Sequence, residues 1–446
     1  MILDRESLPF LVEGLERLEE GFTDLPQVQK RTDLESVREV LLSVAERMQD
    51  NYPYFHPFYA GQMLKPPHPV ARLAYMLSMW VNPNNHALDG GKASSRMEKE
   101  AVEEIARMFG WRTHLGHLCS GGTMANLEAL WVSGRLRPGS RIVASQQAHY
   151  THERIAGVLG LSFTSVPCDG KGRMDTVALE ETLKSGDVGT VVVTMGTTAT
   201  GAVDSLAEII RLQASYRFRI HVDAAYGGYF VLSNALAETT RKQFDVIDQV
   251  DSIAVDPHKH GLQPYGCGCI LFKDPEVGTL YKHDSPYTYF TSQDLHLGEI
   301  SLECSRAGAS AVALWATQRL MPLVPYGTFA ESLSACRQAA LRLSEKIAAS
   351  PQFTLPFLPE LDIVVWSPVG ESASAVSTAS VRIFEALEAE GVYLAIARLP
   401  RRILDSAYAH FTWDQDHITC LRSCLMKPEH LDWIDVIWEK IQEVTG

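Results

Sequence analysis

Short runs of β-branched and apolar residues alternate with amphipathic helical segments between residues 81 and 325. The runs are RIVAS (141–145), TVVVTM (190–195), FRIHVD (218–223), SIAVD (252–256) and GCILF (268–272). Helical patterns such as 124–135 and 205–215 lie between them. Because this alternation covers both faces of a sheet with helices, it predicts an α/β domain built on a mostly parallel sheet.

Two further segments flank this large domain (81–325). Residues 1–80 show helical periodicity broken by the proline-rich stretch FHPFYAGQMLKPPHPV. We expect an N-terminal helical arm with little core of its own, which packs on another surface such as a second subunit. Residues 326–446 are mainly helical with the strand-like DIVVW (362–366), which predicts a small C-terminal α/β domain.

The formal charge of −14 argues against nucleic acid or an anionic membrane surface as the main partner. The N-terminus is acidic and helix-like where a signal peptide is basic and then apolar. The longest apolar stretch, near 73–81, is far shorter than the ~20 residues of a membrane span. We therefore expect a cytoplasmic protein. The eight scattered cysteines predict neither a zinc site nor a disulfide framework.

Two residues follow predicted strands at the edge where an open parallel sheet binds ligands. Lys259 comes after SIAVD and a proline turn, and a partly desolvated amine there can form an imine with an aldehyde. Asp223 ends FRIHVD, and a buried carboxylate needs donors or a cation, such as a protonated pyridine nitrogen. Alone, Lys259 also fits a surface lysine, and Asp223 a helix cap or a metal ligand.

Two more features belong to the same edge. In SGGTMANLEALW, Gly121, Gly122 and Thr123 open a helix, which suits a bound phosphate, although a simple capped helix has the same pattern. His149 follows RIVAS and is suited to stacking on a ring and to proton transfer. A metal held by His149 and His152 is the rival interpretation. It lacks evident carboxylate or cysteine partners, so we expect no metal.

On HVDAAYGG, DPHKHG, SGGTMANLEAL and GTTATGAVD, the chain resembles the group II amino-acid decarboxylases that depend on pyridoxal 5′-phosphate (PLP). This family includes glutamate, aromatic amino-acid and tyrosine decarboxylases, and the resemblance spans roughly residues 50–430. It implies the type I fold of PLP-dependent transferases and a homodimer with a shared active site. The implied reaction converts an L-amino acid to the amine and CO₂.

The resemblance also implies roles for individual residues. Lys259 corresponds to the imine lysine, Asp223 to the partner of the pyridine nitrogen and His149 to the histidine on the ring. The remaining cofactor positions that it implies are Gly121, Gly122 and Thr123 around the phosphate, His258 beside it, Thr198 near the ring face and 3′-oxygen, and Ala225 under the ring.

Two segments depart from the family pattern or leave a choice open. Asp256 stands where many members have asparagine, and a carboxylate repels a phosphate, so we expect Asp256 to point away or to be protonated. Residues 282–299 correspond to the mobile loop over the active site. Tyr287 and Tyr289 are both candidates for the tyrosine that protonates the substrate's α-carbon.

The substrate is the least constrained prediction. His56, Phe58 and Tyr59 are candidate pocket residues whose rings slightly favour an aromatic, tyrosine-like substrate, although interface packing fits equally well. Arg422 matches an arginine that meets a carboxylate in glutamate-type members, yet aromatic decarboxylases have it too. An aspartate, glutamate or cysteate decarboxylase is the alternative.

Other reactions on the same cofactor are also possible. A cysteine desulfurase-like lyase needs a loop cysteine, for which Cys304 is the candidate. We expect Cys304 instead to be a core residue, followed by a helix over 309–320 at a dimer interface. An aldehyde-forming variant is disfavoured because His149 and a loop tyrosine are both present. A binding or scaffold protein without activity would be expected to lack Lys259, Asp223 or His149, and all three are present.

Overall fold

The computed structural model describes residues 3–28, 32–282, 295–408 and 411–445. Its large domain is built on a seven-stranded sheet in the order β1-β7-β6-β5-β4-β2-β3. Strands β3, β2, β4, β5 and β6 run parallel, whereas β7 is antiparallel to both of its neighbours. The predicted α/β class is therefore confirmed. The strands are β1 (Leu115–Cys119), β2 (Arg141–Ser145), β3 (Phe163–Val166), β4 (Val188–Thr194), β5 (Arg219–Asp223), β6 (Ser252–Val255) and β7 (Gly268–Phe272).

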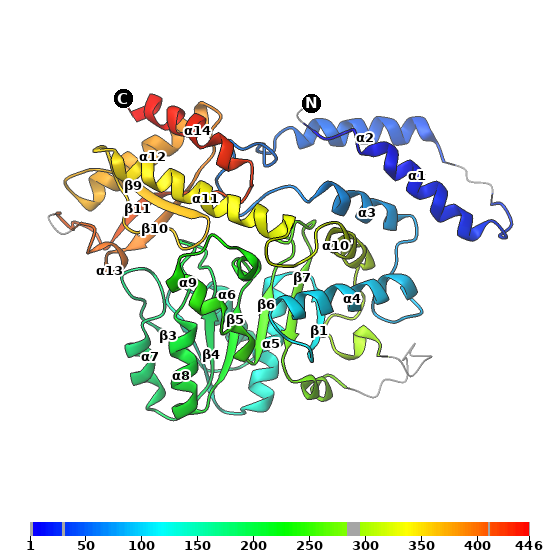
Figure 1. The fold of residues 1–446 in the computed structure, drawn as a ribbon, viewed down its shortest axis with the longest axis horizontal. Coiled ribbons are helices and arrows are strands. Elements are labelled where there is room, and N and C mark those ends of the chain that lie inside the picture. The colour runs from blue at the N-terminus through cyan, green and yellow to red at the C-terminus, as the bar shows by residue number, and fades with distance from the viewer. Residues whose placement is uncertain (1–2, 29–31, 283–294, 409–410, 446) are drawn as a thin grey trace.

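Helices cover both faces of this sheet (Figure 1). Val191, Val192 and Val193 of β4 alternate between the two faces and are all fully buried, which requires a helical layer on each side. The covering helices are α4 (Lys92–Met108), α5 (Gly122–Leu136), α6 (Thr151–Val158), α7 (Thr176–Leu183), α8 (Leu206–Tyr216), α9 (Glu238–Phe244) and α10 (Gly308–Leu320). Short 3₁₀ helices lie at Glu20–Phe22, Gly228–Leu232, Ile247–Gln249, Pro275–Leu280 and Leu297–Glu299.

In the large domain, the predicted strands agree closely with those of the structure, with two additions. RIVAS and GCILF coincide with β2 and β7. Strand β1, LGHLC, is not predicted from the sequence, because its glycine and histidine break the apolar pattern. Strand β3, FTSV, is not predicted either, since it is a half-polar edge strand in which Val166 alone is buried.

The small domain is an antiparallel four-stranded sheet in the order β10-β11-β9-β8, covered by helices (Figure 1). Trp366 of β9 is 0% exposed, packs edge-on against Phe353 at 5.0 Å between ring centroids, and donates from Nε1 to Ser423. The elements are α11 (Thr328–Ala349), β8 (Phe353–Thr354), β9 (Ile363–Pro368), α12 (Ala373–Ala389), β10 (Ala395–Pro400), α13 (Arg401–Leu404), β11 (His417–Cys424) and α14 (His430–Thr445).

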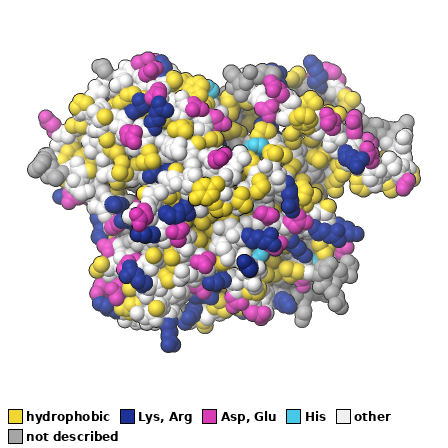
Figure 2. Space-filling view, viewed as in Figure 1, with side chains coloured by type: hydrophobic (Ala, Val, Ile, Leu, Met, Phe, Trp, Pro, Cys, Tyr) yellow, Lys and Arg dark blue, Asp and Glu magenta, His cyan; other side chains and the backbone are white. Residues whose placement is uncertain are grey.

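The N-terminal segment forms α1 (Leu8–Glu19), α2 (Leu34–Met48) and α3 (Pro69–Met79). In Figure 1, α1 and α2 project from the body of the protein. They leave large apolar side chains exposed, and Figure 2 shows hydrophobic surface there among charged groups. These side chains include Leu8, Phe10, Val12, Val37, Val40, Leu41, Leu42 and Val44. Within the described ranges, no helix is both long and apolar enough to cross a membrane.

The small domain's core supplies a stability prediction. Trp366→Ala should lower the free energy of unfolding by about 3–5 kcal/mol, because it leaves a cavity in a closely packed core. The matched control is Trp80→Ala, since Trp80 is 60% exposed and should change stability little. Urea unfolding followed by circular dichroism measures both. Equal midpoints for the two variants would contradict the packing seen around Trp366.

Candidate active site

A cavity of about 320 Å³ lies at the carboxyl ends of the central parallel strands, against the first turn of α5. It brings together nearly all the residues that the sequence placed at this edge. Its lining consists of Ser120, Gly121, Gly122, Thr123, Met124, Asn126, His149, Thr151, Thr194, Gly196, Thr198, Asp223, Ala225, Tyr226, Asp256, His258 and Lys259.

Asp223 ends β5 as a buried carboxylate surrounded by donors. Its Oδ2 accepts hydrogen bonds from His152 Nε2 at 2.8 Å and Asn126 Nδ2 at 3.2 Å. Its Oδ1 accepts from the backbone N–H of Ala225 at 3.1 Å. Burial by itself raises the pKa of Asp223, but the hydrogen bond and charge of His152, with the charge of Lys259, hold it well below the usual range. The carboxylate is therefore ionised and can hold a cationic partner.

Two side chains that the sequence analysis did not assign to this site complete this support. His221 donates from Nε2 to Asn126 Oδ1 at 2.8 Å, and its Nδ1 lies 2.9 Å from Ser252 Oγ. Burial lowers the pKa of His221 to about 3, so its ring is neutral. Because His221 fixes the amide of Asn126, the Nδ2 group faces Asp223.

The missed residues follow simple spacings. His221 lies two residues before Asp223 and therefore points to the same face of β5. Asn126 lies one helical turn after Gly122, and His152 three residues after His149. These spacings place the three residues near predicted ones, but the hydrogen bonds that they make depend on contacts between elements.

The start of α5 forms a narrow backbone cradle. Gly121 has a φ of +153°, a conformation that residues with side chains rarely adopt. A Cβ on Gly268 of β7 would lie 2.5 Å from the backbone of Gly121, so the strand passes directly against the loop. The first N–H groups of a helix have no partner within it, so the cradle presents free donors to an anion.

Asp256 lies in this cavity, so the expectation that it points away is wrong. Its Oδ2 lies 3.0 Å from Lys259 Nζ and 3.5 Å from His258 Nε2. Asp256 is only 2% exposed, and its Oδ1 has no hydrogen-bond partner among the described residues. A Cβ on Gly122 would lie 2.9 Å from Oδ2, so the carboxylate adjoins the cradle itself. Its inward position brings the carboxylate into contact with the Lys259 amine.

His149 also reaches the cavity. Its Nδ1 accepts a hydrogen bond from the backbone N–H of Thr151 at 3.3 Å, which leaves the proton of the neutral ring on Nε2. Burial lowers the pKa of His149, so the ring is neutral near pH 7. His152, the other half of the rival metal pair, is instead the donor to Asp223.

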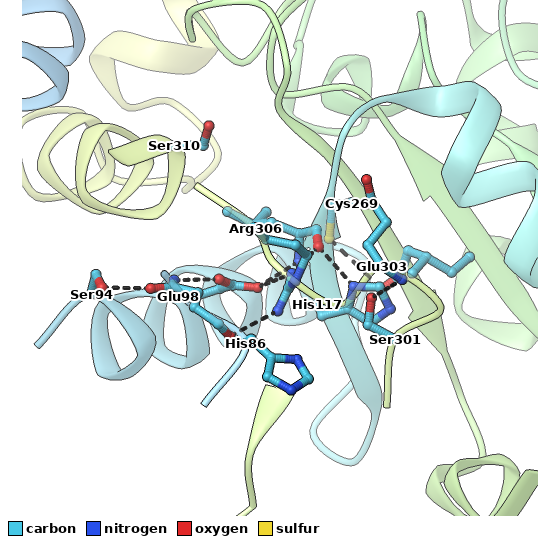
Figure 3. Close-up of polar contacts among 12 residues, drawn as sticks. His86, Ser94, Glu98, His117, Cys269, Ser301, Glu303, Arg306 and Ser310 are labelled. Atoms are coloured by element: carbon cyan, nitrogen blue, oxygen red, sulfur yellow. Dashed lines mark hydrogen bonds and ion pairs between the residues drawn. The ribbon is translucent and has the colours of Figure 1, made fainter. Parts of the chain in front are cut away.

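A polar cluster braces the chain just before the cradle (Figure 3). Arg306 Nη1 lies 2.8 Å from Glu98 Oε1, which also accepts from the backbone N–H of Leu118 in β1. Glu303 accepts from the backbone N–H of Ser120 at 3.0 Å. Cys304, the residue after Glu303, is exposed, so the expectation that it is a core residue is wrong. The lining of the cavity just described includes no cysteine.

Several predicted site residues are not part of this cavity. His56 and Phe58 pack their rings against Trp433 at 5.0 and 5.2 Å, and Tyr59 packs against Tyr54 at 4.8 Å. Arg422 of β11 is 4% exposed and contacts Gln62 Oε1 at 3.4 Å. Tyr287 and Tyr289 lie outside the described residues.

Residues 124–368, more than half of the chain, match the pyridoxal-dependent decarboxylase conserved domain. An L-tyrosine decarboxylase of Enterococcus faecium is 29% identical over 409 residues, covering 69% of this chain and 67% of that protein. A probable L-tyrosine/L-aspartate decarboxylase of Methanothermobacter thermautotrophicus is 29% identical over 311 residues, covering 69% and 82%.

The fold has counterparts among solved structures. The crystal structure of mouse CSAD superposes with a TM-score of 0.79 over 99% of both chains, at 19% sequence identity. At this identity the similarity establishes the fold, and the domain match establishes the family. The chain belongs to the pyridoxal-dependent decarboxylase family and is a PLP-dependent amino-acid decarboxylase.

Proposed function

We propose that this enzyme decarboxylates an aromatic L-amino acid, with L-tyrosine as the first candidate. The observation that carries this proposal is the similarity to relatives named L-tyrosine decarboxylase, from Enterococcus faecium and, at 28% identity, from Levilactobacillus brevis. The aromatic residues of the proline-rich stretch give weaker support. They lie at the junction of the arm and the small domain, where Tyr59 bridges Tyr393.

An acidic substrate such as L-aspartate is the second candidate. It is favoured by the relative named L-tyrosine/L-aspartate decarboxylase and by Arg422. The guanidinium of Arg422 is buried, and its Nε and Nη2 have no partner among the described residues. Because unpaired buried donors are costly, they favour a carboxylate ligand nearby.

The cavity residues fit PLP on their chemistry. The cradle of Gly121, Gly122 and Thr123 suits the phosphate, and ionised Asp223 suits the ring nitrogen. Lys259 supplies the amine that bonds the aldehyde carbon. His258 Nδ1, Asp256 Oδ1 and Thr194 Oγ1 are buried polar atoms without a partner among the described residues, as expected at a site that receives a polar ligand.

When bound, PLP accepts the electron pair left at the α-carbon as CO₂ departs. Asp223 keeps the ring nitrogen protonated through its own ionised state. His149 lies in the cavity, and its imidazole is suited to taking up or releasing a proton. Thr198 and Ala225 line the space available to the ring.

We also propose that the enzyme is a homodimer, with the exposed apolar side chains of α1 and α2 buried against a second copy. Only Leu11 is buried on these two helices. Such an apolar surface is more typical of an interface than of free protein surface.

A panel of L-amino acids tests the substrate. PLP-loaded enzyme should release tyramine and CO₂ from L-tyrosine, measured by chromatography and trapped CO₂. Products from L-aspartate, L-glutamate or L-cysteate alone would favour the acidic substrate. Alanine and sulfide from L-cysteine would point to the desulfurase alternative. Lys259→Ala should abolish turnover, and it should remove the PLP adduct that borohydride otherwise fixes on that peptide.

The donors to Asp223 predict an effect on cofactor binding. His152→Leu removes a charge-assisted hydrogen bond and should weaken PLP binding by about tenfold or more. His152→Gln keeps an N–H donor and should retain most of the affinity. Absorbance titration with PLP measures both dissociation constants. Equal losses of PLP affinity in the two variants would show that the N–H donor at position 152 does not contribute to PLP binding.

The position of Asp256 predicts that replacing its carboxylate strengthens PLP binding. Asp256→Asn removes a negative charge beside the phosphate cradle and should tighten PLP binding, on the order of threefold or more at low salt. The gain should shrink at high salt, where charge repulsion is screened. If the variant instead binds PLP more weakly, Asp256 contributes a favourable contact rather than repulsion.

A further inference from the structure

A second cavity of about 320 Å³ lies where the proline-rich stretch, the large domain and the segment before α14 meet. None of its lining residues also lines the cofactor cavity. Tyr226 lines the first cavity and His260 the second, with their ring centroids 4.9 Å apart. The two cavities therefore lie on opposite sides of this pair of rings.

Two lysines from distant parts of the chain line the second cavity. Lys427 is 4% exposed and donates from Nζ to the backbone carbonyl of Tyr59 at 2.5 Å. Lys65 donates from Nζ to the backbone carbonyl of Met426 at 3.0 Å. Neither ammonium group lies within ion-pair distance of a carboxylate in the part of the chain that the structure describes. Each has three N–H donors, of which these contacts use one.

The cavity carries more positive than negative charge. Glu429 is the only acid in its wall, and the histidines, His68 and His260, have pKa values lowered by burial. Burial and the neighbouring charge of Lys65 lower the pKa of Lys427 to about 7. Burial also lowers the pKa of half-buried Lys65, so an anion placed between the two amines would stabilise the charged form of both.

The rest of the wall is largely apolar. Phe329 and Leu333 of α11 are 2% exposed, and Phe55, Leu262, Met321 and several prolines complete the lining. A bare inorganic anion would leave this surface uncovered, whereas a ligand with an apolar body would fill it.

We propose that this second cavity binds a small organic carboxylate. Its carboxylate group lies between Lys65 and Lys427, and its apolar body packs against Phe329 and Leu333. The site is separate from the cofactor cavity and adjoins it through His260, the residue next to Lys259.

Competitive acetylation of lysines in the holoenzyme, read by peptide mass spectrometry, tests this proposal with phenylacetate as the probe. Phenylacetate should protect Lys427 from acetic anhydride in a saturable manner. The neutral isostere phenylacetamide should not protect it. Lys65→Met should weaken the protection by about tenfold or more, as expected for loss of one charged contact. Lys65→Arg, which keeps the charge, should retain most of it.

Lys171→Met is the matched control, because Lys171 is exposed and does not line this cavity. It should leave the protection of Lys427 unchanged. Three results would overturn the proposal: no protection by phenylacetate, equal protection by phenylacetamide, or full protection in a folded Lys65→Met variant. If Lys65→Met does not fold, the comparison of phenylacetate with phenylacetamide on the unsubstituted enzyme decides whether the cavity binds a carboxylate. If phenylacetate binds in the cofactor cavity alone, it would slow turnover without protecting Lys427. That outcome is a case of the first result and overturns the proposal.

Discussion

The free-energy cost of burying a carboxylate at the end of β5 sets the arrangement of the active site. Asp223 meets this cost with donors from three elements: His152 of α6, Asn126 of α5 and the turn that begins at Ala225. If either helix shifts, an ionised group loses a donor. The same three hydrogen bonds therefore keep Asp223 charged and hold α5 and α6 in register with the sheet.

Charges of opposite sign are ordered along the cavity. Asp223 lies at one end, where a cationic ring nitrogen is favoured, and the amide cradle of α5 lies at the other, where a phosphate is favoured. Asp256 interrupts this order with a carboxylate next to the cradle, and Lys259 at 3.0 Å offsets it. This electrostatic pattern would favour one orientation of a bound cofactor, with its phosphate at the cradle and its ring nitrogen at Asp223.

The sequence was sufficient to predict the class of fold and the site residues that directly follow strands. Lys259, Asp223 and His149 were predictable because strand ends in a parallel sheet converge on one edge. His152, Asn126 and His221 were not predicted, since their roles depend on contacts between elements rather than on local pattern. The inward position of Asp256 was also missed, because its ion pair with Lys259 is a matter of side-chain geometry. Cys304 was wrongly placed in the core, as one residue of an irregular segment has no periodicity to follow.

The small domain takes part in positioning the chemistry, although it lines none of the cofactor cavity. Asp362, the residue before β9, accepts a hydrogen bond from Tyr226 at 2.6 Å and lies 3.2 Å from His260 Nε2. Tyr226 is three residues from Asp223, and His260 adjoins Lys259. Burial raises the pKa of Asp362, but its contacts with His260 and Tyr226 lower it below its usual value. Docking of the small domain therefore fixes the two turns that carry Asp223 and Lys259.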